Sequence, residues 1–195
     1  MFQPSLMSLH ITKRDGTKEP FNADKINRSI ERAAAGLFDP ISKVIQVATE
    51  TRLTLYDGIT TEEMDQATIN AAIQNVKDDP EYDKIATRLL VKTIYKSVLG
   101  EYGNEPTALS ERHKEFFPQY IENGVMNGNL DKRMKEKFNL VELAEVLKIE
   151  RDELFQYAGL SSLLDRYTIK NTDQKPLETP QYLFMRIAMG LSYNE

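Results

Sequence analysis

The chain has 195 residues, enough for one ordinary domain or two small ones that each bury a core. It contains no cysteine, which excludes disulfides, thiolate metal sites and thiol or thiyl chemistry within this chain. A formal net charge of −5 argues against a general nucleic-acid binder, because such domains carry a basic face, but it is compatible with a small phosphate ligand.

The overall composition, 41% hydrophobic and 28% charged, is typical of a folded globular protein. No apolar run approaches the length that crosses a bilayer, and the opening segment MFQPSLMSLHITKRDG lacks the basic-then-apolar order of a secretory signal. We therefore expect a cytoplasmic protein that binds neither membrane nor nucleic acid.

The first predicted element is a β-hairpin over residues 8–21, where apolar and polar side chains alternate on both sides of an Asp15-Gly16 turn. A helix follows, with apolar side chains at helical spacing and an end near Gly36. Either Asn22 or Asp24 is suited to cap its amino end.

Three more helices are predicted in the first half of the chain. The second begins at Asp39-Pro40 and stops at Asp57-Gly58, since proline favours the first turn and Asp-Gly favours a turn. The third begins at the capping-box pattern Thr60-x-x-Glu63, and the fourth begins after Asp79-Pro80 and ends near Gly100. We expect a domain of residues 1–102, made of the hairpin and four helices.

The second half, residues 103–195, is predicted to be mostly helical, which makes the fold class mainly α with one small β-hairpin (α+β). Turn-forming residues and periodicity indicate helices over 108–122, 140–148 and 180–191, turns at 123–124, 127–128 and 171–175, and a strand over 164–170.

Several cationic side chains are expected at the hairpin turn or near helix ends, where an anion could bind. Lys13 and Arg14 flank the hairpin turn, and Lys25 lies one turn into the first helix, whose amino end attracts phosphate. Thr61 opens the third helix, and Lys96 lies late on the fourth. These residue types suit a site of triphosphate size.

Local physics leaves a plainer interpretation open. The basic residues can be solvated surface charges, Thr61 can belong to a helix cap, and Glu19 and Asn22 can either read the edge of a base or cap the helix that follows. No G-x-x-x-x-G-K-[ST] loop occurs, which argues against a phosphoryl-transfer enzyme.

A family resemblance favours the nucleotide. The run Ile11–Gly16 followed by Glu19 and Lys25-Ile26 resembles the opening motif of the ATP-cone, and Tyr56–Thr61 and Arg88–Lys96 fit the same family in order and spacing. The ATP-cone is a module of a hairpin and helices that binds ATP or dATP. The resemblance implies a nucleotide site made of Lys13, Arg14, Glu19, Asn22, Lys25, Ile26, Thr61, Asp65 and Lys96. Some members have histidine at the position of Asp65.

The second half resembles one host of such cones. Leu164–Tyr167, Glu178–Gln181 and the helix that follows resemble the segment that leads into the ten-stranded barrel of class I ribonucleotide reductase large subunits. The cone-bearing transcriptional repressor of reductase genes has a four-cysteine zinc ribbon, which a chain without cysteine excludes. The anaerobic reductase is less similar over Asp165–Gln181.

The resemblance implies an allosteric domain that ATP activates and dATP inhibits, with Mg²⁺ carried by the nucleotide phosphates. The catalytic cysteines of that family lie in the barrel, so this chain alone is expected to be inactive. Its expected partners are the barrel domain, the radical-bearing small subunit and further large subunits, contacted through helix surfaces between residues 61 and 96. The alternative is a non-catalytic helical interaction module whose vestigial cone binds no nucleotide.

Overall fold

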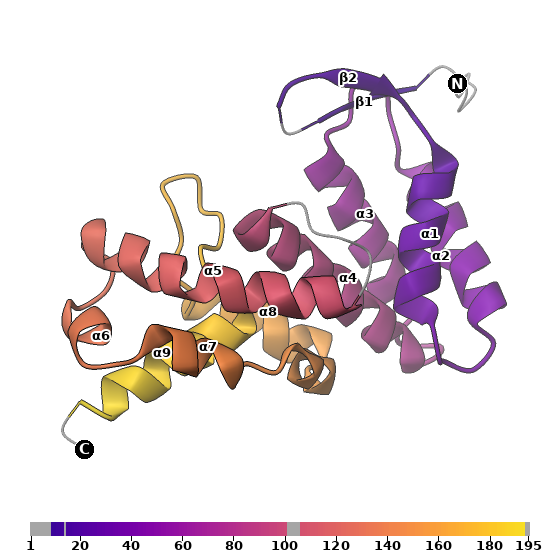
Figure 1. Cartoon of the computed structure of the whole chain (residues 1–195). Helices are drawn as coiled ribbons and strands as arrows, with labels where there is room; N and C mark the ends of the chain where they lie inside the picture. The colour runs from indigo at the N-terminus through magenta and orange to yellow at the C-terminus, as the bar shows by residue number, and fades with distance from the viewer. Residues whose placement is uncertain (1–8, 14, 101–105, 194–195) are drawn as a thin grey trace. The chain divides into compact units, whose positions relative to one another are not determined.

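A computed structural model describes residues 9–13, 15–100 and 106–193 (Figure 1). Two compact units, Met1–Leu90 and Val91–Glu195, divide the chain, with the division inside helix α4 (Glu81–Leu99). The structure is mainly helical with one small hairpin, which confirms the predicted fold class. Within the described residues, no helix combines the length and apolar character needed to cross a membrane.

The first unit carries the predicted hairpin. Strands β1 (His10–Thr12) and β2 (Lys18–Pro20) are antiparallel, with Ile11 opposite Glu19. Helices α1 (Ala23–Ala34), α2 (Pro40–Leu53) and α3 (Thr61–Gln74) follow, and the hairpin lies at one end of them (Figure 1).

The helices of this unit begin where the sequence signals predicted. Asn22 caps α1, its side-chain Oδ1 accepting the Asp24 N–H at 2.9 Å. Asp39 caps α2, and Thr60 and Glu63 form the capping box of α3. Because these caps involve residues within three positions of each other, local sequence was sufficient to predict them.

The first half of α4 fastens the other helices of the unit. The Lys43 ammonium of α2 is buried and contacts Asp79 at 2.7 Å and Glu81 at 3.0 Å, and these two carboxylates raise its pKa. The Arg88 guanidinium donates to the Ala33 and Ala35 carbonyls, each at 2.8 Å, which satisfies the free carboxyl end of α1. α1, α2 and α4 are therefore joined by polar anchors as well as by apolar packing.

Helix α2 ends at Leu53, four residues before the predicted stop, and its outward face is uncharged. The exposed positions of this helix are Pro40, Ile41, Ser42, Ile45, Gln46, Thr49 and Leu53. Phe38 just before the helix is also exposed, and a groove of about 550 Å³ lies between α1 and α2. About half of the other exposed residues that the structure describes in this unit are charged, so the uncharged face of α2 is distinct from the surface around it.

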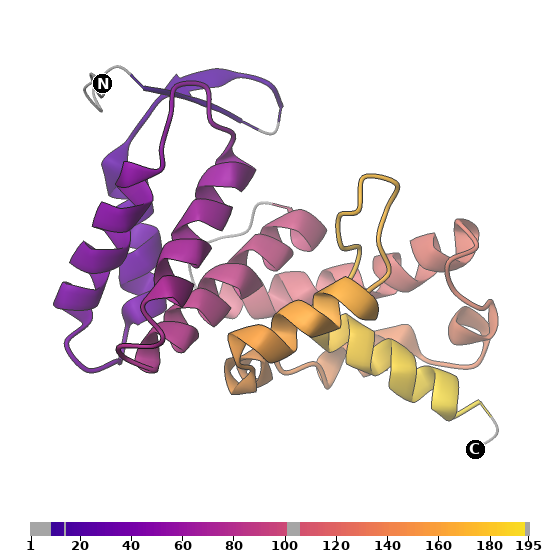
Figure 2. The same ribbon diagram turned by 180° about the vertical axis from the view of Figure 1, so that it is seen from behind.

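The second unit contains the rest of α4 and α5 (Pro106–Met126), α6 (Arg133–Glu136), α7 (Leu140–Glu145), a 3₁₀ helix η2 (Ile149–Leu154), α8 (Tyr157–Arg166) and α9 (Pro180–Leu191) (Figure 2). The sequence predicted α9 with its bounds and α7 within three residues. It missed α6, η2 and α8, which are short or lack a clear capping signal.

Two predictions in this unit are wrong. The turn expected at Asn123-Gly124 is helical, because α5 continues to Met126. Gly124 is needed for packing instead, since a Cβ there would lie 2.5 Å from Cδ1 of Leu130. The strand expected over 164–170 does not form: α8 extends through Arg166, and beyond it a single bridge pairs Lys170 with Pro176.

The loop between α8 and α9 projects from the unit (Figures 1 and 2) and is fastened at its base by a buried carboxylate. Glu178 is fully buried; Arg186 binds both its oxygens at 2.9 Å, and the Tyr120 hydroxyl and the Ile169 N–H also donate to it. Four donors satisfy this charge, which is what its burial requires. The predicted polar turn over 171–175 forms within this loop, and its Asn171 side chain accepts two backbone N–H groups.

We predict that Glu178→Gln lowers the free energy of unfolding by about 2–4 kcal/mol, because it leaves the half-buried Arg186 guanidinium without its counter-charge. The matched control is Glu145→Gln, which removes the carboxylate of the more exposed pair with Lys114 and should change stability by less than about 0.5 kcal/mol. Urea unfolding followed by circular dichroism measures both. Equal losses of stability in the two variants would show that the contribution of the Glu178–Arg186 pair does not depend on its burial.

A second buried carboxylate, Asp152, makes no ion pair with the part of the chain that the structure describes. Its oxygens accept from the Tyr95 hydroxyl and the Gln181 amide, each at 2.6 Å, and burial raises its pKa to about 6. Nearby, His113 is buried with Nε2 unpaired, and burial lowers its pKa to about 4. The two groups therefore have opposite effects on stability as pH changes.

The folded chain holds the Asp152 proton more tightly than the unfolded chain, so its stabilisation is complete below about pH 4 and is lost as pH rises through 6. We predict that Asp152→Asn, which keeps a hydrogen-bonding shape without the charge, is more stable than the parent above pH 6, by at most about 3 kcal/mol. The difference should shrink towards pH 4. His113 titrates in both proteins and cancels in the comparison. A difference that is the same at pH 4.5 and pH 7.5 would contradict this assignment.

Candidate functional site

Strand β1 is hydrogen-bonded along both edges. β2 pairs with one edge, and on the other the Thr12 N–H donates to the Ile59 carbonyl at 2.9 Å while the Gly58 N–H donates to the His10 carbonyl at 2.9 Å. The Asp57 carboxylate accepts the His10 N–H at 2.8 Å, and this bond is the largest cause of its lowered pKa. The segment that leads into α3 is therefore held against the hairpin.

The sequence did not predict this pairing. Asp57-Gly58 was interpreted as a helix stop, whereas the structure uses Asp57 as an acceptor for β1 and places Gly58 at φ 86°. Asp-Gly is a turn signal, and a turn before a capped helix was the available hint. The pairing explains why α2 ends early, because residues 57–60 are needed beside β1.

The hairpin turn forms at the predicted Asp15-Gly16. Asp15 accepts the Thr17 N–H at 2.9 Å and its hydroxyl at 2.6 Å, which lowers the pKa of Asp15. Gly16 has a φ of 82°, a conformation that glycine adopts without strain, and its N–H donates to the Lys13 carbonyl. Arg14 lies outside the described residues, so its role stays a prediction.

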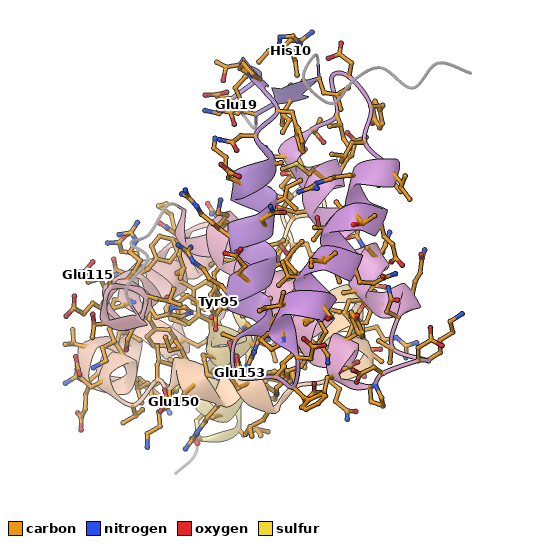
Figure 3. All side chains as sticks on the ribbon, turned by 90° about the vertical axis from the view of Figure 1, so that its right-hand side faces the viewer. His10, Glu19, Tyr95, Glu115, Glu150 and Glu153 are labelled. Atoms are coloured by element: carbon orange, nitrogen blue, oxygen red, sulfur yellow. The ribbon has the colours of Figure 1, made fainter. Side chains whose placement is uncertain are left out.

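Three predicted site residues meet at the hairpin around Glu19, which is labelled in Figure 3. The Glu19 carboxylate on β2 lies 2.9 Å from the Lys13 ammonium and 2.8 Å from the Lys25 ammonium on the first turn of α1. The two ammonium groups lower the pKa of Glu19, and Glu19 raises the pKa of Lys13. Glu19 is the most enclosed of the three, with 25% of its side chain exposed, against 45% for Lys13 and 59% for Lys25.

Two further predicted residues flank this cluster. The Asn22 side-chain oxygen is committed to the α1 cap, which leaves its Nδ2 group as the donor available to a ligand. Ile26 belongs to the core, with 3% of its surface exposed. Its contact with a nucleotide stays a prediction.

Thr61 and Asp65 lie one turn apart on the first part of α3, and both are half-buried. The cap of α3 is Thr60, so the Thr61 hydroxyl is not the group that satisfies the helix end. Pairing of β1 with residues 58–60 keeps the start of α3 beside the hairpin. Lys96 lies in the last turn of α4, in the second compact unit, and its part in the site stays a prediction.

This arrangement is suited to bind an anion. Two exposed ammonium groups converge next to the amino end of α1, where unpaired N–H groups and the helix dipole favour negative charge. Within the described residues, no group of three or more histidine or carboxylate side chains could ligate a metal ion.

Two family models match the chain. Residues 9–97 match the ATP cone domain, and residues 153–195 match the ribonucleotide reductase all-alpha domain. The chain belongs to the ribonucleotide reductase large-subunit family. The cone match contains the hairpin and every predicted site residue, and the all-alpha match contains α8, α9 and the Glu178 loop.

Curated relatives agree along nearly the whole chain. The alpha subunit of ribonucleoside-diphosphate reductase from Helicobacter pylori is 36% identical over 186 residues, which is 95% of this chain and 22% of that protein. The corresponding alpha subunits of Escherichia coli (ribonucleoside-diphosphate reductase 1) and Enterobacteria phage T4 are each 30% identical over 96% of this chain and 24% of their own length. The chain thus spans less than a quarter of these relatives.

We predict that Thr60→Ala lowers the free energy of unfolding by about 1 kcal/mol, because it removes the side-chain acceptor for the Glu63 N–H. Thr61→Ala is the matched control and should change stability by less than about 0.5 kcal/mol, since another residue makes the cap. Thermal or urea unfolding measures the pair. An equal loss in both variants would show that Thr61 shares the cap.

Proposed function

We propose that the ATP cone of this chain binds ATP or dATP together with Mg²⁺ and thereby controls the activity of a ribonucleoside-diphosphate reductase. The convergence of Lys13 and Lys25 on one point beside the amino end of α1 is the observation that supports it most directly. The coarser part, a regulatory ATP cone in a reductase large subunit, follows from the family.

The proposed site assigns a role to each predicted residue. Lys13, Arg14 and Lys25 bind the phosphates, because ammonium and guanidinium groups form strong charge-assisted hydrogen bonds with phosphate oxygens. Thr61 adds its hydroxyl at the amino end of α3 to the phosphate contacts, and Asp65, one turn later and half-buried, contacts the sugar side. Glu19 and Asn22 read the edge of the base, and the family resemblance adds Ile26 and Lys96 to the nucleotide contacts.

ATP and dATP differ by one hydroxyl, so their opposite effects need differential binding to two states of the whole protein. Moving a population from mostly active to mostly inactive takes about 5 kcal/mol, whereas one hydrogen bond supplies about 1 kcal/mol. We propose that assembly supplies the rest, with the dATP-bound cone contacting the radical-bearing small subunit or another large subunit.

The sequence placed this contact on helix surfaces between residues 61 and 96. Among the described residues of that stretch, no large hydrophobic side chain is exposed, whereas Phe38, Ile41, Ile45 and Leu53 are. The uncharged face of α2 therefore joins the proposed contact surface. Reductase chemistry itself is proposed to lie outside this chain, which has no cysteine.

Isothermal titration of the chain with dATP and Mg²⁺ tests the site. We expect binding to wild-type protein, and we expect Lys25→Gln to weaken it more than about tenfold, since a hydrogen bond to a charged group contributes about 1.5–3 kcal/mol. Lys18→Gln is the matched control: it removes a charge from the same hairpin at a residue that does not pair with Glu19, and should weaken binding less than about threefold.

Equal losses in the two variants would reduce the role of Lys25 to general electrostatic attraction. No heat from the folded wild-type chain with either nucleotide would reject the proposed function in favour of an interaction module that binds no nucleotide. Mass measurement of the complex gives the number of nucleotides and of chains.

A further inference from the structure

The two lysines at the hairpin already hold an anion that belongs to the chain. One oxygen of Glu19, Oε2, lies 2.9 Å from the Lys13 ammonium, and the other, Oε1, lies 2.8 Å from the Lys25 ammonium. Each carboxylate oxygen is thus used by a different cation. The arrangement resembles the way in which a phosphate group would bridge the same pair.

Phosphates and the Glu19 carboxylate would compete for these cations. An anion bound to both ammonium groups lies within a few ångströms of any second anion bound there, and the two negative charges repel each other. A triphosphate carries several charges and Glu19 carries one, so the ligand has the stronger attraction for the lysines. Binding therefore requires the carboxylate to withdraw from at least one of them.

Breaking the contacts of Glu19 with Lys13 and Lys25 costs little free energy because the two lysines are exposed to water. Lys13 and Lys25 expose 45% and 59% of their side chains, and ion pairs at such sites contribute little to stability because water and salt screen them. Glu19 is fixed on β2, opposite Ile11, so its backbone stays in place when the side chain withdraws. The exchange needs side-chain rotation alone.

We propose that Glu19 is a built-in counter-anion that competes with the ligand's phosphates for Lys13 and Lys25 and so sets the affinity of the cone. This inference rests on the proposed function. Glu19 keeps the two lysines together and cancels one of their two positive charges, and it raises the concentration of phosphate needed to displace it. The affinity of the cone is lower than its cations alone would give.

Inorganic tripolyphosphate is the probe that isolates this competition, because it has neither base nor sugar. By isothermal titration we expect Glu19→Gln to bind tripolyphosphate about three- to tenfold more tightly than the wild-type chain. Asp24→Asn is the matched control, since it removes one carboxylate from the first turn of α1 at a residue that makes no ion pair with any residue the structure describes. It should change the affinity less than about twofold.

A direct readout on the wild-type chain complements the variants. With ¹³C-labelled glutamate, the Glu19 carboxyl resonance is identified by its absence in Glu19→Gln, and saturating tripolyphosphate should shift it as the ammonium contacts are lost. An unmoved resonance in a chain that binds the probe would overturn the proposal. Unchanged or weaker binding by Glu19→Gln would do the same.

Results that overturn the role of Glu19 can be told apart from results that reject nucleotide binding. If the wild-type chain binds neither tripolyphosphate nor adenine nucleotide, the nucleotide site itself is rejected. If it binds both and Glu19→Gln gains no affinity, the cone stands and only the counter-anion role is removed. A melting temperature within a few degrees of wild type shows that the variant is folded.

Discussion

The site depends on a three-residue strand that is hydrogen-bonded on both edges. A two-stranded hairpin alone is marginally stable in water. Here β1 pairs with β2 on one side and with the segment before α3 on the other. Ile11 of β1 and Ile59 of that segment are both buried. Because α1 follows β2 directly and α3 follows the paired segment, the amino ends of both helices are fixed at the hairpin. The candidate site is a consequence of that pairing.

Two carboxylates in the chain show how burial decides what an ion pair does. Glu178 is fully buried, with its charge divided among Arg186, Tyr120 and a backbone N–H, so moving it would leave charges without partners. Glu19 makes contacts of similar length to two lysines that water can reach. The first pair is structural because its partners cannot be replaced. The second is exchangeable, which is the property that a ligand site requires.

The sequence predicted the elements whose signals are local. Each of α1, α3 and α9 begins at a side chain that accepts a backbone N–H two or three residues further along the chain. The turns at Asp15-Gly16 and Gly128 need backbone conformations that glycine favours. The sequence prediction failed where a contact with another residue determines the local structure. Gly124 lies inside α5 and leaves room for the side chain of Leu130, and Leu164–Arg166 belong to α8 instead of a strand. Alternation over a few residues does not separate a short strand from the end of an amphipathic helix.

The candidate site shows the same division. Lys13, Glu19 and Lys25 are individually ordinary surface charges, and local physics gave no reason to bring them together. Their meeting depends on the β1–β2 register, which places Glu19 opposite Ile11, and on the cap that sets the direction of α1. Family resemblance supplied the set of residues, but not the sharing of Glu19 between the two lysines. That sharing is a tertiary fact.

A ligand can act as a switch only through an element with two arrangements of similar free energy. α1, α2 and α4 are poor candidates within their unit, because buried Lys43 and the carbonyl-capping Arg88 join them through contacts that are costly to break. The hairpin side is different, since its polar contacts at Glu19 are exposed and its strands are three residues long. In the proposed function, a nucleotide that replaces Glu19 on the lysines would act on exposed side-chain contacts, which cost less to rearrange than the buried contacts that join the helices. This is where a difference as small as one hydroxyl has the best prospect of changing the structure.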